Sequence, residues 1–312
     1  TERAKFMTWL PTVMPGNIRM LCTAITGTEE KAVQYHSGLF VKNLDYFTEA
    51  EAGEMLNMLC LKQHKTLPGK VTSAILEKRR DDKQLAISSP LWLSLAVNMM
   101  MALDQDDFEK MSQLEGRGDE QIESYMVNMA KEFAPLPGSL FLSLVNKAGT
   151  MFGEEFTKAV FSYLACSRNG LREKDFEKLI PMTSIKWDPL QFAGLRRWFK
   201  AHIAMQGENL QWSLEHSFLK NSILQNINSN LKFEIHADIA TYLLSLKPND
   251  KIRVSETMFH LINANDLNRA ALILANPNLD KESLSAICRI FGDFLNESSE
   301  YYPYNPFDWI FS

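Results

Sequence analysis

The sequence predicts a mainly α-helical protein with one small β-hairpin, and three patterns support this fold class. Apolar residues recur at helical spacing over much of the chain, as within 170–180. Asp188 and Pro189 are typical of a helix start, the first as N-cap and the second at the first helical position. The apolar segments 202–205 and 210–214 flank a glycine-containing turn, which indicates the two strands of a hairpin. Helix, helix and hairpin in this order predict a winged helix.

The composition is that of an ordinary globular protein. The 312 residues are 46% hydrophobic and 23% charged, and this length is typical of two or three domains. Apolar runs are too short for a transmembrane helix, and we find no signal peptide. The four cysteines are scattered through apolar contexts, as is typical of reduced buried thiols, so we expect a cytoplasmic protein. The net charge of -5 gives no general attraction to nucleic acid or to an anionic membrane.

The beginning of the chain predicts one buried strand. The segment 17–25 is a short apolar run that follows Pro15 and Gly16, and we find no second run of this kind near it. Because a buried strand needs partners in a sheet, we expect the rest of its sheet to lie outside the chain. We therefore interpret the chain, which begins at Thr1, as a piece of a longer protein.

From residue 48 onward, helix signals dominate the sequence. Residues 48–51 are typical of a capping box, and Pro90 follows two serines at the start of a strongly apolar helix. The prolines and the glycine of 135–138 indicate a break, where we place a domain boundary. Further helices are predicted at 71–80, 122–129, 140–151, 156–166, 233–246, 255–263, 267–275 and 281–295, the last four as hairpins similar to those of solenoid repeats.

We find none of the familiar catalytic or metal-binding motifs in the chain. It has no glycine-rich phosphate loop ending in Gly-Lys-Ser or Gly-Lys-Thr and no nucleophile elbow. Its six histidines and four cysteines never fall at zinc-ligand spacing. We therefore predict no catalytic residue and no metal ligand within it, and whether the parent protein is an ATPase stays open.

The order of the remaining signals resembles a known family. A Trp-Leu-Pro sequence at 9–11 precedes the strand that ends at Thr23, the capping-box and Ser-Ser-Pro helices follow, and Leu-Glu-His at 214–216 closes the winged helix. This succession resembles the C-terminal portion of a NACHT-type STAND NTPase, a class related to the AAA+ ATPases. The resemblance implies the end of a nucleotide-binding P-loop α/β domain with its remnant sensor 1 strand at 1–43, a helical lid at 44–137, a winged-helix domain at 138–228, and a helical region similar to tetratricopeptide repeats at 229–312.

The resemblance also implies three nucleotide-binding residues. Thr23 would end the sensor strand, Pro90 would lie against adenine, and His216 would contact the phosphates. The lid and the winged helix would clamp ADP or ATP that is held by an upstream P-loop domain of the same protein, and so control oligomerisation in signalling. ATP or ADP with Mg²⁺ would be cofactors of the intact parent, not of this chain alone. Self-association or protein partners would use the helical region, with no membrane. Ala24 stands where related strands often carry a basic sensor residue, a departure that bears on hydrolysis more than on binding.

Each of the three assignments has a plainer alternative. Pro90 also suits an ordinary first-turn proline, and Thr23 also suits a residue that simply ends a strand. His216 also suits a capping or core histidine at the start of the next helix.

Two rival functions stay open beside the nucleotide switch. Arg196, Arg197 and Lys200 form a basic edge on the second winged-helix helix, which in a DNA-binding regulator would enter the major groove. The acidic residues around the domain favour a solvated or interdomain face instead, so nucleic acid is not expected as a partner. A scaffold with a decayed nucleotide site is the other alternative.

His236 is predicted to be a packing residue of a helical hairpin.

Overall fold

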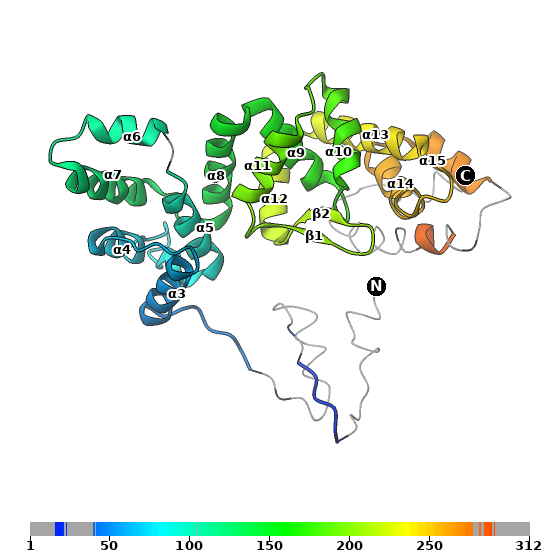
Figure 1. The fold of residues 1–312 in the computed structure, drawn as a ribbon. Coiled ribbons are helices and arrows are strands. Elements are labelled where there is room, and N and C mark those ends of the chain that lie inside the picture. The colour runs from blue at the N-terminus through cyan, green and yellow to red at the C-terminus, as the bar shows by residue number, and fades with distance from the viewer. Residues whose placement is uncertain are drawn as a thin grey trace. The chain divides into compact units, whose positions relative to one another are not determined.

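The protein is mainly helical, as the sequence predicts, and its described part contains one two-stranded antiparallel sheet (Figure 1). In the computed structural model the chain divides into two compact units. One is Tyr46–Ser245, and the other combines Thr1–Asp45 with Leu246–Ser312. The structure describes residues 16–21, 23, 40, 42–103, 105–276, 281, 284–288 and 290.

The unit Tyr46–Ser245 holds most of the described helices. They are α3 (Glu49–Lys62), α4 (Gly69–Leu76), α5 (Pro90–Met101), α6 (Gln105–Ser112), α7 (Gly118–Glu132), α8 (Pro137–Phe152), α9 (Glu154–Cys166), α10 (Glu173–Leu179), α11 (Pro189–Trp198), α12 (Ser217–Asn226) and α13 (Ser229–Ser245). Short 3-10 helices occupy Ala86–Ser88 and Ile180–Thr183. In the other unit, α14 (Lys251–Asn263) and α15 (Leu267–Leu274) follow one another.

Three helix starts lie where the sequence predicts them, because their signals are local. Thr48 caps α3 with its hydroxyl on the N–H of Glu51, whose carboxylate accepts from the N–H of Thr48 in return. Ser89 caps α5, with Pro90 as the first helical residue. Asp188 caps α11. Such caps satisfy N–H groups that the first turn of a helix leaves without partners.

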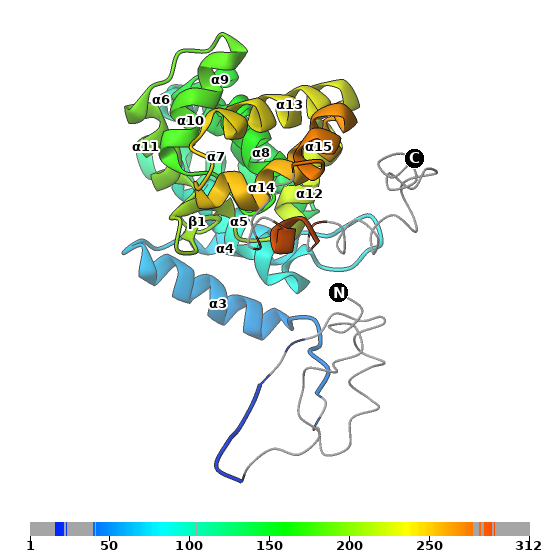
Figure 2. The ribbon, with the colours of Figure 1, turned by 90° about the vertical axis from the view of Figure 1, so that its right-hand side faces the viewer.

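Helix α5 is the central helix of the first part of this unit. It packs against α3, α7 and α8, and α3 runs beside it at the edge of the unit (Figure 2). The indole N–H of Trp92 donates to the carbonyl of Ala134 at 2.8 Å. A helix that is apolar on nearly all sides needs neighbours on several sides, and its buried residues are Trp92, Leu93, Leu95, Ala96, Val97, Met99 and Met100.

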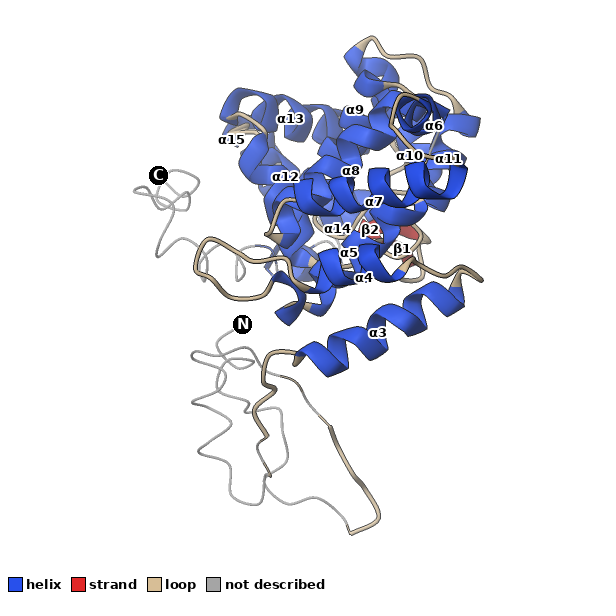
Figure 3. Ribbon diagram, turned by 90° about the vertical axis from the view of Figure 1, so that its left-hand side faces the viewer, coloured by secondary structure: helices blue, strands red, loops and turns tan. Residues whose placement is uncertain are grey.

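The predicted hairpin is confirmed, and a third segment of the backbone, at Leu171, pairs with its second strand. Strand β1 (Ile203–Gln206) pairs antiparallel with β2 (Gln211–Leu214), and these strands are red in Figure 3. Leu171, just before α10, forms a β-bridge with Trp212 through hydrogen bonds of 3.0 and 2.8 Å. The order of elements is therefore helix α9, the bridge at Leu171, helices α10 and α11, and then the hairpin.

The core between α8, α9 and the end of α11 is aromatic. The rings of Phe141, Phe161 and Phe199 meet edge to face, with centroid separations of 5.8, 5.8 and 4.7 Å. All three side chains are at most 1% exposed. Edge-to-face pairs stabilise a core beyond the area that they bury, so this cluster fixes the place where α11 turns into the hairpin.

The segment 17–25 is where the structure departs most from the sequence prediction. Its described residues, 17–21 and 23, form no strand, and the side chain of Leu21 is 96% exposed. The prediction of a buried strand is therefore wrong for these residues. A strand needs a neighbour to pair its N–H and C=O groups, and the described residues supply none to this segment.

Helix α6 was not predicted from the sequence, and several other departures concern where helices begin and end. The helix predicted at 71–80 ends at Leu76, because Arg79 pairs with Leu85 in an isolated β-bridge. Helices α13 and α14 each begin four residues earlier than predicted, at Ser229 and Lys251 instead of 233 and 255. The helix predicted at 281–295 is helical at residues 281, 284–288 and 290, and its remaining residues lie outside the described part.

Replacing Gly170 by alanine should destabilise the hairpin more than the same change at Gly153. Both glycines have positive φ, +91° and +89°, so both variants carry a backbone strain of about 1 kcal/mol. A Cβ at Gly170 would also collide with the backbone carbonyl of Trp212, whereas at Gly153 its nearest neighbour is 3.7 Å away. We expect Gly170→Ala to lose about 1–3 kcal/mol more in urea unfolding. Equal losses would mean that β2 moves away freely.

Candidate functional site

The three residues predicted to bind nucleotide are all exposed. Thr23 lies in the unit that contains Thr1–Asp45 and has no regular secondary structure. Pro90 is the first residue of α5, and His216 immediately precedes α12. The last two belong to the same compact unit, Tyr46–Ser245.

His216 occupies a position that leaves its side chain available. Its backbone is extended, with φ -111° and ψ 119°, and its carbonyl accepts from the N–H groups of Leu219 and Lys220 at the start of α12. The imidazole makes no capping hydrogen bond to that helix. The first N–H groups of a helix have no intrahelical partners and favour anions, so the start of α12 suits a negative ligand.

His202 lies next to this position, and sequence analysis missed it. Its carbonyl accepts from the N–H of Glu215 at 3.0 Å, which anchors the residue before His216. Its side chain is 1% exposed, and its Nε2 lies 2.9 Å from Nδ2 of Asn98 on α5. Burial, and next the charge of nearby His216, lower the pKa of His202 to about 4. The ring is therefore neutral near pH 7, and it joins α5 to the segment that carries His216.

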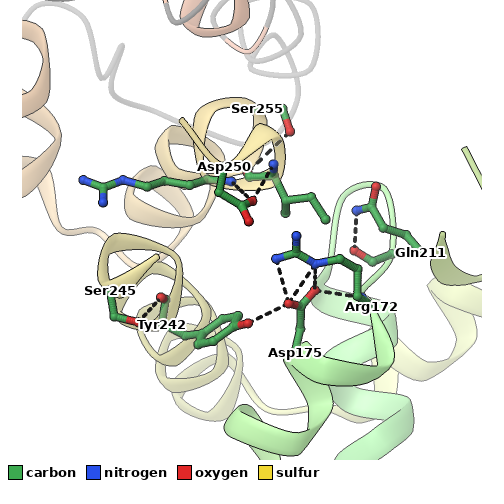
Figure 4. Close-up of polar contacts among 10 residues, drawn as sticks. Arg172, Asp175, Gln211, Tyr242, Ser245, Asp250 and Ser255 are labelled. Carbon is green, nitrogen blue, oxygen red and sulfur yellow. Dashed lines mark hydrogen bonds and ion pairs between the residues drawn. The ribbon is translucent and has the colours of Figure 1, made fainter. Parts of the chain in front are cut away.

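A buried ionic cluster fixes α10 against α13, as Figure 4 shows. Asp175 is fully buried and accepts from the backbone N–H of Arg172 at 2.8 Å and from the hydroxyl of Tyr242 at 2.7 Å. A guanidinium nitrogen of Arg172 lies 2.9 Å from the same carboxylate. Burial, together with the hydrogen bond to Asp175, raises the pKa of the Tyr242 hydroxyl. The sequence offered only a local signal here, an acidic residue three positions after Arg172.

One of the three residues of the basic edge of α11, Arg196, contacts other residues of the protein. The guanidinium of Arg196 lies 5.0 Å from the ring centroid of Phe192 and 4.8 Å from that of Trp212. It also forms an ion pair with Glu173 at 3.4 Å. Arg197 and Lys200 are exposed. These contacts make Arg196 a packing residue between α11 and the hairpin.

The remaining ionisable groups of interest are buried. His236 is 7% exposed, and burial, followed by the charges of Lys220 and Lys232, lowers its pKa to about 4. Burial raises the pKa of the Cys166 thiol to about 12, so this cysteine is a poor nucleophile. His236 is therefore buried and neutral near pH 7, and its role as a packing residue of a helical hairpin stays a prediction.

The described part of the chain offers neither a cluster of metal ligands nor a helix suited to a bilayer. Among the residues that the structure describes, no group of three or more His, Cys, Asp or Glu side chains could hold a metal ion. Over the same residues, no helix has both the length and the apolar character that crossing a membrane requires.

Comparisons with models of protein families, with curated proteins and with solved structures found no match to this chain. The fold itself defines the class at a coarse level: a mainly helical protein with a small antiparallel hairpin, whose described part places an exposed histidine at the junction of hairpin and helix.

Proposed function

We propose that the chain is the lid and winged-helix part of a nucleotide-dependent signalling switch of the NACHT type. The order of elements from α9 through the Leu171 bridge, α10, α11 and the hairpin supports a winged-helix assignment for residues 138–228. The run of helices α3 to α7 supports a helical lid at 44–137. ADP would hold the winged helix against the nucleotide-binding core, and exchange for ATP would free it to oligomerise.

The observation that carries this proposal is the state of His216. The residue is exposed, lies two positions after the end of β2, and its imidazole makes no capping bond to α12. A histidine used only as a cap would bond to that helix, and a core histidine would be buried as His202 and His236 are. An exposed ring at a helix N-terminus is suited to donate a hydrogen bond to a phosphate oxygen. Pro90, at the start of α5 in the same unit, would contact adenine.

A DNA-binding role has less support. The recognition helix of a winged helix needs basic side chains that are free to meet phosphates. Arg196 is instead held by Glu173, Phe192 and Trp212, and the chain is acidic overall.

We expect ADP to bind this chain weakly and to perturb the start of α12. In an NMR titration to millimolar ADP, the amide signals of residues 217–219 and the ring signals of His216 should shift. His216→Ala should abolish these shifts, because the phosphate loses its hydrogen-bond donor. His64→Asn is the matched control, since His64 is exposed but lies after α3, and asparagine tolerates its positive φ of 53°. Adenosine, which lacks phosphates, should leave α12 unchanged.

Three results would count against this function. Shifts that persist in His216→Ala would remove the histidine from the site. No perturbation at any ADP concentration would favour a scaffold with a decayed site. A sequence-specific gel shift at low salt, abolished by charge reversal at Arg197 and Lys200, would favour the DNA-binding regulator.

A further inference from the structure

A chain of side-chain hydrogen bonds connects three elements that are distant in sequence. Nε2 of Gln63, at the end of α3, donates to Oδ1 of Asn98 on α5 at 3.3 Å. Nδ2 of Asn98 donates in turn to Nε2 of His202 at 2.9 Å. The relay runs from the exposed Gln63 through the partly buried Asn98 to a ring that is 1% exposed. Its direction is set at the Gln63 end, because Oδ1 of Asn98 accepts there and leaves only Nδ2 to face the histidine.

This direction determines the tautomer of His202. Because Nε2 accepts a hydrogen bond, the proton of the neutral ring lies on Nδ1. Nδ1 is buried and has no hydrogen-bond partner among the described residues. The ring also packs edge to face on Phe141, with centroids 6.0 Å apart. Nε2 of His202 therefore has a hydrogen-bond partner, and Nδ1 has none among the described residues. A ring bonded at one nitrogen is held less rigidly than a ring bonded at both.

The backbone of His202 also bonds to Glu215, the residue before His216. The carbonyl of His202 accepts from the N–H of Glu215, and its N–H donates to the carbonyl of Phe199 at 2.7 Å. His202 thus bonds to α5 through its side chain and to the end of β2 through its backbone. A movement of α5 that pulls on the His202 ring is therefore passed to Glu215 through a single residue.

We propose that His202 is a positioning residue that couples α5 to His216, and that the Asn98–His202 hydrogen bond is the latch between them. The contact joins the helices that precede α8 to the hairpin that follows α11. Opening it separates a partly buried donor from a buried acceptor, so α5 and the hairpin favour one joint arrangement. The regulatory meaning of this coupling, control of the phosphate contact at His216, rests on the proposed function. The coupling itself does not.

The first test uses the unaltered 312-residue chain without nucleotide. Long-range ¹H–¹⁵N NMR of ¹⁵N-histidine-labelled protein at pH 7 reads the tautomer of each ring. We expect His202 to carry its proton on Nδ1. A proton on Nε2 would reverse the donor and the acceptor at Asn98, and it would overturn the relay whatever any variant does.

The second test measures amide hydrogen exchange in Asn98→Ala. Alanine keeps the helical propensity of α5 and removes the donor, so exchange at Glu215 and across β2 should become roughly tenfold faster. Ser94→Ala, one turn earlier on α5, is the matched control and should leave the hairpin unchanged. His202→Phe should speed exchange similarly, and the double variant should add little to either single change.

The results of these tests distinguish the Asn98–His202 coupling from the proposed nucleotide-binding function. Faster exchange confined to α5, or additive effects in the double variant, would overturn the latch. Both measurements are made without nucleotide, so they can succeed while the ADP titration fails, which would leave a structural coupling with no nucleotide site. If ADP does bind, Asn98→Ala should also reduce the ADP-induced shifts at His216, whereas Ser94→Ala should not.

Discussion

Lowering the pH from 7 to 5 is expected to destabilise the unit Tyr46–Ser245 by about 4 kcal/mol through two buried histidines. His202 and His236 are at most 7% exposed, and burial is the main reason that the pKa of each falls from 6.5 to about 4. Near pH 7 both rings are neutral in the folded and in the unfolded chain. The folded protein then incurs no cost from a buried charge.

The sign follows from proton binding. Between pH 6.5 and pH 4 the unfolded chain protonates both histidines, whereas the folded chain keeps them neutral. Stability is therefore complete above pH 6.5 and is lost as the pH falls toward 4, at about 1.4 kcal/mol per pH unit for each histidine. Asp238 acts in the opposite direction, because burial raises the pKa of its carboxyl group.

Urea unfolding at pH 7, 6 and 5, followed by near-ultraviolet circular dichroism, measures this dependence. His202→Gln and His236→Gln should each remove about half of the pH slope, whatever they do to stability at pH 7. His64→Asn is the control: His64 is exposed, and asparagine tolerates its positive φ of 53°. A slope unchanged in both glutamine variants would show that other groups control the acid response.

Asp175→Ala is expected to cost about 3–5 kcal/mol, because it breaks a buried ion pair by removing one partner. The carboxylate is fully buried, and it neutralises Arg172, whose side chain is 12% exposed. Removing it takes one negative charge away from a nearly buried guanidinium and leaves the Tyr242 hydroxyl without the hydrogen bond that it donates to Asp175. It also removes the bond that Asp175 accepts from the N–H of Arg172 at the start of α10.

Two matched variants separate the charge from the hydrogen bonds in this cluster. Tyr242→Phe removes one hydrogen bond and should cost about 1 kcal/mol in urea unfolding at pH 7. Glu154→Ala breaks an exposed ion pair with Lys158, at 2.6 Å, and should leave the unfolding midpoint close to that of the unaltered protein, because solvent screens such a pair. If Asp175→Ala cost no more than Tyr242→Phe, water would have to reach Arg172 in the folded state, and the burial of the charge would not explain the stability of α10.

Local signals were enough to predict the features that lie within one helical turn or one hairpin. The caps at Thr48, Ser89 and Asp188 place helix starts, because each cap bonds to N–H groups two or three residues away. The hairpin was predictable for the same reason, since its two strands are separated by a short turn. The position of His216 followed from its place two residues after the second strand.

Roles that depend on residues far apart in the chain became visible only in the folded protein. Asp175 meets Tyr242 across 67 positions, and Asn98 meets His202 across 104. Neither pair leaves a pattern in the sequence, because packing, and not local propensity, brings them together. In the sequence Arg196 resembles an exposed basic residue, whereas in the structure it contacts Trp212 and Glu173. The apolar run at 17–25 is typical of a buried strand, yet apolar character alone cannot supply the hydrogen-bond partners that a strand requires.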